Sequence, residues 1–183
     1  VQAVTKYSEN LLADGTGTCA GENAAACFVT QVSEVSMGSL GLIIEDEAQL
    51  AQAMAFLASV VVQVVAEVSA TSSEGDLIGA MMTGFVGGFD ELQDFGFTAD
   101  TQLLQDFTSS VIVDLATYYE GDIAGLNDAI SGAISGVVEG LNETLGLSNL
   151  DFSDNPDALV TLFEDAITTA AEEIEADTGV VIE

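Results

Sequence analysis

The chain has 183 residues, of which 31 are acidic and only one is basic, and the formal net charge is −30. A charge of this sign and size is repelled by nucleic-acid phosphates and by anionic membrane surfaces, so both are excluded as partners. Hydrophobic residues make up 49% of the chain and it has a single proline, which excludes a disordered or linker-like chain.

The N-terminal part contains the two cysteines of the chain, Cys19 and Cys27. Because the chain has no histidine and no further cysteine, the pair lacks the ligands that a zinc site requires. A disulfide that closes a turn onto the start of the first helix is the preferred interpretation, and it predicts an oxidising compartment. The alternative is a pair of buried free thiols.

Hydrophobic residues at three- and four-residue spacing predict five to six amphipathic helices. Their starts carry polar capping residues, and in chain order we expect helices over 22–38, over 46–70, from Ser72, from Thr98 as N-cap, from Asp122, and from Asp154 or Asn155 with Pro156 in the first turn. Short loops marked by glycine predict that consecutive helices pack antiparallel in a bundle.

The predicted fold is therefore mostly α, with a single domain over 1–183. In it the disulfide-bearing region 1–45 packs on a helical bundle formed by 46–178. Three β-branched runs, at 1–4, 41–44 and 179–183, are candidates for short β segments. Residues 129–136 repeat Ala-Ile-Ser-Gly, which predicts a helix face of small residues suited to close packing.

Most catalytic chemistry lacks its usual residues in this chain. Without histidine there is no Ser–His–Asp arrangement, and without arginine there is no clamp for a phosphate. Lys6, the only basic residue, lies in no phosphate-loop motif. Gly84, Gly87 and Gly88 lie inside a helical pattern rather than after a strand, which argues against dinucleotide binding. We therefore expect no enzymatic activity.

Calcium is the cofactor that such an acidic composition favours, because hard cations prefer carboxylate oxygens. The candidate ligands are Asp151, Asp154 and Asp157, in a segment that resembles the start of an EF-hand loop. The segment lacks the glycine of that loop, and Leu162 occupies the position of its last acid, so capping of the following helix is the preferred interpretation. Asn142 begins an Asn-Glu-Thr sequon and is a candidate glycosylation site.

A segment rich in alanine, phenylalanine and methionine, at 77–85, is followed by Phe-Thr-Ala-Asp at 97–100 and by three further predicted helices. This order, over residues 76 to about 179, resembles the helical terminal domains of spider-silk proteins (spidroins). The resemblance implies a secreted helical assembly domain. The chain departs from that family in having no tryptophan and too few basic residues for the family's acid–base pairing between subunits.

Residues 50–66 form the most apolar stretch, but two glutamines interrupt it and no basic residue flanks it. We interpret it as a buried core helix, and we expect no membrane span. The predicted disulfide, a start without methionine and the scarcity of basic cleavage sites favour a processed protein that is secreted, extracellular or at the cell surface.

We expect an extracellular structural subunit that self-assembles into a filament, silk, sheath or matrix, with assembly tuned by pH, salt or divalent cations. The alternative is a secreted helical carrier that binds a lipid or pigment in its core. Strand addition between copies at the chain ends is the expected contact. Its apolar residues are Val1, Val4, Val180, Val181 and Ile182.

Overall fold

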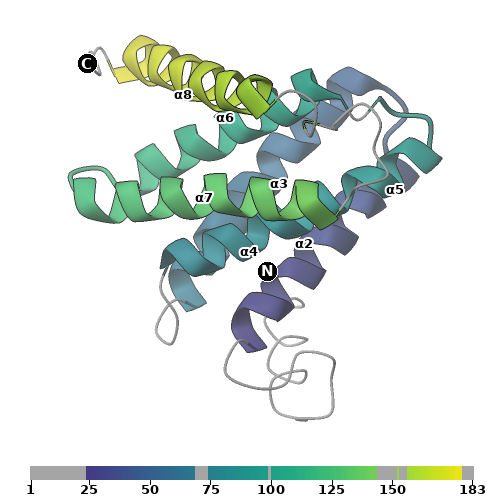
Figure 1. Ribbon diagram of the computed structural model, residues 1–183, viewed down its shortest axis with the longest axis horizontal. Helices are drawn as coiled ribbons and strands as arrows, with labels where there is room; N and C mark the ends of the chain where they lie inside the picture. The colour runs from purple at the N-terminus through teal and green to yellow at the C-terminus, as the bar shows by residue number, and fades with distance from the viewer. Residues whose placement is uncertain (1–23, 69–73, 99, 144–151, 153–155, 179–183) are drawn as a thin grey trace.

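The residues that the computed structural model describes, 24–68, 74–98, 100–143, 152 and 156–178, form helices joined by short connections (Figure 1). The helices are α2 (Ala24–Ile43), α3 (Glu47–Val68), α4 (Glu74–Gly87), α5 (Phe89–Asp94), α6 (Thr101–Tyr118), α7 (Ile123–Glu143) and α8 (Pro156–Thr178). No strand occurs in these ranges. The predicted mostly-α fold is confirmed, with six long helices and the short α5, which the sequence did not predict as a separate helix.

The β segment expected near 41–44 is wrong, because residues 41–43 form the last turn of α2. The amide of Ile44 donates a hydrogen bond to the carbonyl oxygen of Leu40 at 3.0 Å, so the helical pattern continues to the end. At Gly41 the helix approaches Phe95 so closely that an added Cβ would lie 2.8 Å from the ring Cγ. Tertiary packing therefore overrides the local β tendency. The candidate β segments at 1–4 and 179–183 lie outside the described residues.

The helix starts follow the capping rules, with one correction. Asp122 precedes α7 and accepts a hydrogen bond from the Gly125 amide at 3.1 Å, and α8 begins at Pro156, both as expected. The N-cap of α6 is Asp100 and not Thr98. Asp100 has an extended backbone, and its carboxylate accepts a hydrogen bond from the Leu103 amide at 3.0 Å.

We expect Asp100→Ala to lower the free energy of unfolding by about 1 kcal/mol, because the Leu103 amide at the start of α6 loses its acceptor. Chemical denaturation followed by circular dichroism measures the change. Thr98→Ala is the matched control and should leave the stability unchanged. An equal loss in both variants would contradict the assignment of the cap.

The centre of the bundle is α4, most of whose residues are buried. Its 14 residues, EGDLIGAMMTGFVG, include four glycines, and each glycine costs about 1 kcal/mol of intrinsic helix stability relative to alanine. Packing must therefore supply the stability of this helix. Gly79 faces α7, and Gly84 on another side faces α2, where an added Cβ would lie 2.8 Å from the Ser33 Cβ.

The most extensive helix contacts are α4 with α7 and α2 with α4, which are not consecutive in the chain. The contacting residues follow in the same order along both helices: Gly75 lies against Gly132, and Gly79 lies against Gly136. These two helices therefore run parallel, a pairing between non-consecutive helices that the prediction for consecutive helices does not cover. The Thr83 hydroxyl links them, at 3.2 Å from the carbonyl oxygen of Gly136.

The remaining helices complete one main core and a smaller one. Phe85 of α4 and Phe107 of α6 meet edge to face, with ring centroids 5.0 Å apart. α3 packs on α6 and α4, and α5 packs on α2. α8 lies along α6, where Ile112 and two alanines form the second cluster (Figure 1). α2 contributes Val29 and Met37 to the main core, so the N-terminal helix shares that core with the helices that follow it.

Candidate functional site

Charge is distributed unevenly over the helices. α2 carries one acidic residue, Glu34, in 20 residues, and α3 carries Glu47 and Glu67 near its ends. The whole chain, by contrast, has 31 acidic residues in 183. Among the described helices, α2 therefore carries the lowest share of acidic residues, although the exposed Glu45 and Asp46 follow its end.

Large apolar side chains are exposed on these two helices. Val35, Leu42 and Ile43 of α2 are 63%, 70% and 76% exposed, and Phe56 of α3 is 72% exposed. Scattered exposed apolar residues are normal on a monomer, but a concentration of them on one charge-poor helix is typical of an interaction surface. The outer surface of α2 is therefore the candidate functional site.

This surface does not follow from a prediction of one apolar face for each helix. A signal was present in the sequence. Phe28, Val35 and Leu42 repeat every seven residues, in addition to the buried series that contains Val29 and Met37. α2 packs on α4 and α5 through its buried series, and Val35 and Leu42 of the second series are left largely exposed.

Two described segments, Ala25–Ile43 and Ala48–Val65, are long and apolar enough to cross a membrane by length and composition. Core helices of soluble proteins and signal sequences pass the same test, so it does not distinguish these cases. The expected absence of a membrane span stays a prediction.

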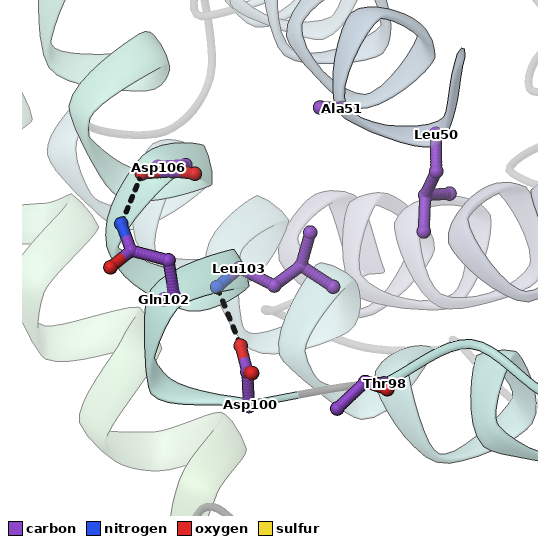
Figure 2. A pocket seen from close by; sticks show the side chains of 7 residues that line it. All are labelled: Leu50, Ala51, Thr98, Asp100, Gln102, Leu103 and Asp106. Carbon is purple, nitrogen blue, oxygen red and sulfur yellow. Dashed lines mark hydrogen bonds between the residues drawn. The ribbon is translucent and has the colours of Figure 1, made fainter. Parts of the chain in front are cut away.

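A pocket of about 200 Å³ lies between the start of α3 and the start of α6 (Figure 2). Leu50 and Leu103 supply apolar atoms, but Asp100, Gln102 and Asp106 line it as well. Its volume is below the roughly 300–1,000 Å³ of typical small-molecule sites. This pocket does not support the carrier alternative.

The polar groups of this pocket are engaged within α6. The Gln102 amide nitrogen donates to the Asp106 carboxylate at 2.7 Å, and Asp100 caps the helix (Figure 2). Their hydrogen bonds thus hold the helix start rather than converge on a ligand. No group of three or more potential metal ligands gathers among the described residues.

The predicted calcium ligands are not brought together by the part of the chain that is described. Asp157 is exposed in the first turn of α8, and Asp151 and Asp154 lie outside the described residues. The calcium site stays a prediction. Asn142 is exposed near the end of α7, so its side chain is accessible to a glycosylating enzyme.

Two further predicted sites fall mainly outside the described residues. Cys27 lies in the first turns of α2 and is half-buried, whereas Cys19 lies outside, and the disulfide stays a prediction. All the apolar residues expected to carry the contact between copies also lie outside: Val1, Val4, Val180, Val181 and Ile182.

A partly buried polar contact joins the end of α6 to the start of α4. The Tyr119 hydroxyl donates a hydrogen bond to the Glu74 carboxylate, and the Tyr118 ring meets the Tyr119 ring edge to face at 5.0 Å. Burial raises the pKa of Tyr119 far above its usual range, and the hydrogen bond and negative charge of Glu74 raise it further. The phenol therefore stays protonated, and it acts as a structural donor rather than a base.

Burial also raises the pKa of Asp114, which is half-buried in α6. The folded state thus binds this proton more tightly than the unfolded state, so the contribution of Asp114 to stability falls as pH rises through the folded-state pKa. At neutral pH the ionised carboxylate destabilises the fold. Partial exposure to solvent keeps the effect small.

We expect Asp114→Asn to raise the free energy of unfolding at neutral pH and to lose this advantage in acid, where the native carboxyl is already protonated. Urea denaturation at several pH values measures the difference. Removing any carboxylate relieves repulsion in so acidic a chain, and the control must share this effect. The control is therefore Asp165→Asn, which removes an exposed carboxylate of α8. If Asp114→Asn raises the free energy of unfolding no more than Asp165→Asn does, the role of burial is contradicted.

Comparison with protein-family models, with curated proteins and with solved structures found no match to this chain.

Proposed function

We propose that the chain is a secreted extracellular structural subunit that associates with copies of itself into a filament, silk, sheath or matrix. The observation that carries the proposal is the exposed apolar surface of α2. Its residues Val35, Leu42 and Ile43 are all more than half exposed on a helix with a single acid. Removing that apolar area from water favours association.

The charge of the chain supports the same proposal by limiting when association occurs. Two copies of net charge −30 repel each other, so an apolar contact forms only where few carboxylates approach or where protons or cations neutralise them. Association controlled in this way suits a protein that is stored dispersed and assembled on a change of conditions. The resemblance to silk terminal domains is consistent with this role and stays part of the proposal.

Static light scattering of the purified protein over a concentration series tests the proposal. We expect the weight-average mass to rise above the 18.8 kDa of one chain as concentration increases, in acidic buffer or in high salt. A mass that stays at one chain under all pH, salt and calcium conditions would contradict a structural subunit.

A further inference from the structure

We propose that α8 is a reversibly docked helix, which leaves α6 at low ionic strength while the helices of the main core stay folded. The change takes place within a single chain, so it goes beyond the proposed function and does not depend on it. It follows from the limited contact of α8 with the bundle, from a buried hydroxyl in that contact and from the charge of α8.

The contact of α8 with the bundle is limited. α8 lies along α6 at the edge of the bundle, and α6 is the one described helix with which it makes extensive contact (Figure 1). Of the described side chains of α8, only Leu162 is both large and buried, and the other buried ones are Ala166 and Ala170. An alanine removes little apolar surface from water. Docking of α8 is therefore stabilised less than the packing of α4, most of whose residues are buried.

A polar group in the contact disfavours docking. Ser109 of α6 is 3% exposed, and its hydroxyl has no hydrogen-bond partner in the described part of the chain. Ile112 forms a cluster with two alanines of α8, and Val113 packs against this cluster. Residues three and four positions apart share a helix face, so Ser109 lies on the face of α6 that α8 covers. Its hydroxyl regains hydrogen bonds to water when α8 leaves, which favours the undocked state.

The charge of α8 also opposes docking. α8 carries seven acidic residues in 23 and no basic residue, and four of the seven fall in its last seven residues. The helix dipole already places partial negative charge at that end, so these carboxylates disfavour the last turns. α6 contributes Asp106 and Asp114, and neither α6 nor α7 has a basic residue. Docking therefore brings a negative helix against helices without a cation.

Ionic strength decides between the two states. The screening length of exposed charges is about 30 Å at about 0.01 M salt and about 3 Å at about 1 M. Glu172 and Glu175 of α8 are exposed, so dissolved salt screens them. High salt thus weakens the repulsion and leaves the apolar contact of Leu162 in place, which favours docking. The apolar core around α4 and its backbone contacts with α7 depend much less on salt.

Hydrogen exchange of the full-length chain, followed by mass spectrometry of peptides from each helix, tests the inference at constant pH. We expect peptides from α8 to exchange at least tenfold faster at about 0.01 M than at about 1 M salt, and peptides from α4 and α7 to change by less than about threefold. The same peptides, exchanged after digestion, correct for the effect of salt on exchange itself. Equal protection of α8 and α4 in low salt, or an equal salt effect on all helices, would overturn the inference.

A pair of charge variants tests the source of the salt effect. Glu172→Gln with Glu175→Gln removes two exposed charges from α8, and Asp90→Asn with Glu139→Gln removes two exposed charges from α5 and α7. We expect the first variant to reduce the salt effect on α8 at least threefold and the second to leave it unchanged. The same reduction in both variants would assign the effect to the net charge of the chain and overturn the role of the charge on α8.

The buried hydroxyl has its own test. We expect Ser109→Ala to slow the exchange of α8 in low salt by about threefold or more, because a methyl group needs no hydrogen bond. The control is Ser110→Ala, since the Ser110 hydroxyl donates to the Asp106 carbonyl oxygen at 3.0 Å within α6. Faster exchange of α8 in Ser109→Ala, or equal slowing in both variants, would overturn the statement that this hydroxyl opposes docking.

Discussion

Gly136→Ala is expected to lower the free energy of unfolding by about 2–3 kcal/mol, although alanine is the better helix former. The reason is the close approach of α7 to α4. A Cβ at position 136 would collide with the carbonyl oxygen of Gly79 and lie 2.8 Å from its carbonyl carbon. The obstacle is helix backbone, which cannot rotate away as a side chain can, so the two parallel helices must separate.

The same argument applies one turn earlier, where a Cβ on Gly132 would lie 2.7 Å from the carbonyl carbon of Gly75. Separation of the helices would also lengthen the Thr83 hydroxyl contact with the carbonyl oxygen of Gly136. Because both glycines hold the same pair of helices, we expect the double variant to lose less than the sum of the two single losses.

The control for both variants is Gly87→Ala, near the end of α4. A Cβ there would lie 3.6 Å from the Glu34 Cγ, an ordinary contact, so the change should be neutral or raise stability by up to about 1 kcal/mol. Chemical denaturation followed by circular dichroism compares these variants with the wild type. Equal stabilities for Gly136→Ala and Gly87→Ala would contradict the close packing of α4 on α7.

Self-association is expected to strengthen at least tenfold when the pH falls from about 7 to about 5, toward the sequence pI of about 4.1. Bringing copies of charge −30 together disfavours ionised carboxylates, which raises their pKa in the assembly. The assembled state then binds more protons than the free monomers. Association is therefore strongest at low pH and is lost as the pH rises through those raised values.

Salt and calcium should replace part of the effect of acid. At about 1 M salt the screening length falls to about 3 Å, which removes most of the repulsion between exposed carboxylates. Calcium at about 1 mM bridges carboxylates more specifically. Sedimentation equilibrium at both pH values, with and without each addition, measures the association constant. An association constant that is unchanged or smaller at the lower pH would contradict this electrostatic mechanism.

Local signals in the sequence were sufficient for the starts of α7 and α8. Asp122 and Pro156 are placed where capping and the fixed backbone of proline require them, and both predictions are confirmed. The repeat at 129–136 correctly predicted a small-residue packing face, since Gly132 and Gly136 lie against α4. The choice of Thr98 over Asp100 failed because both are good caps, and only the backbone geometry distinguishes them.

Non-local contacts account for the rest of the differences. The extension of α2 to Ile43 depends on the Phe95 ring against Gly41, more than 50 residues later in the chain. The parallel pairing of α4 with α7 likewise depends on which helix lies beside which, and loop lengths do not reveal it. The outer face of α2 was missed for a different reason: the seven-residue repeat of Phe28, Val35 and Leu42 is visible in the sequence, but only burial shows that Val35 and Leu42 are exposed.

Electron microscopy of the wild-type protein, concentrated and then brought from neutral pH to about pH 5, tests the central claim most directly. The account predicts dispersed single particles before acidification and ordered assemblies of repeating subunits after it. Dispersed monomers at both pH values, or only amorphous precipitate in acid, would contradict the claim that this chain is a self-assembling structural subunit.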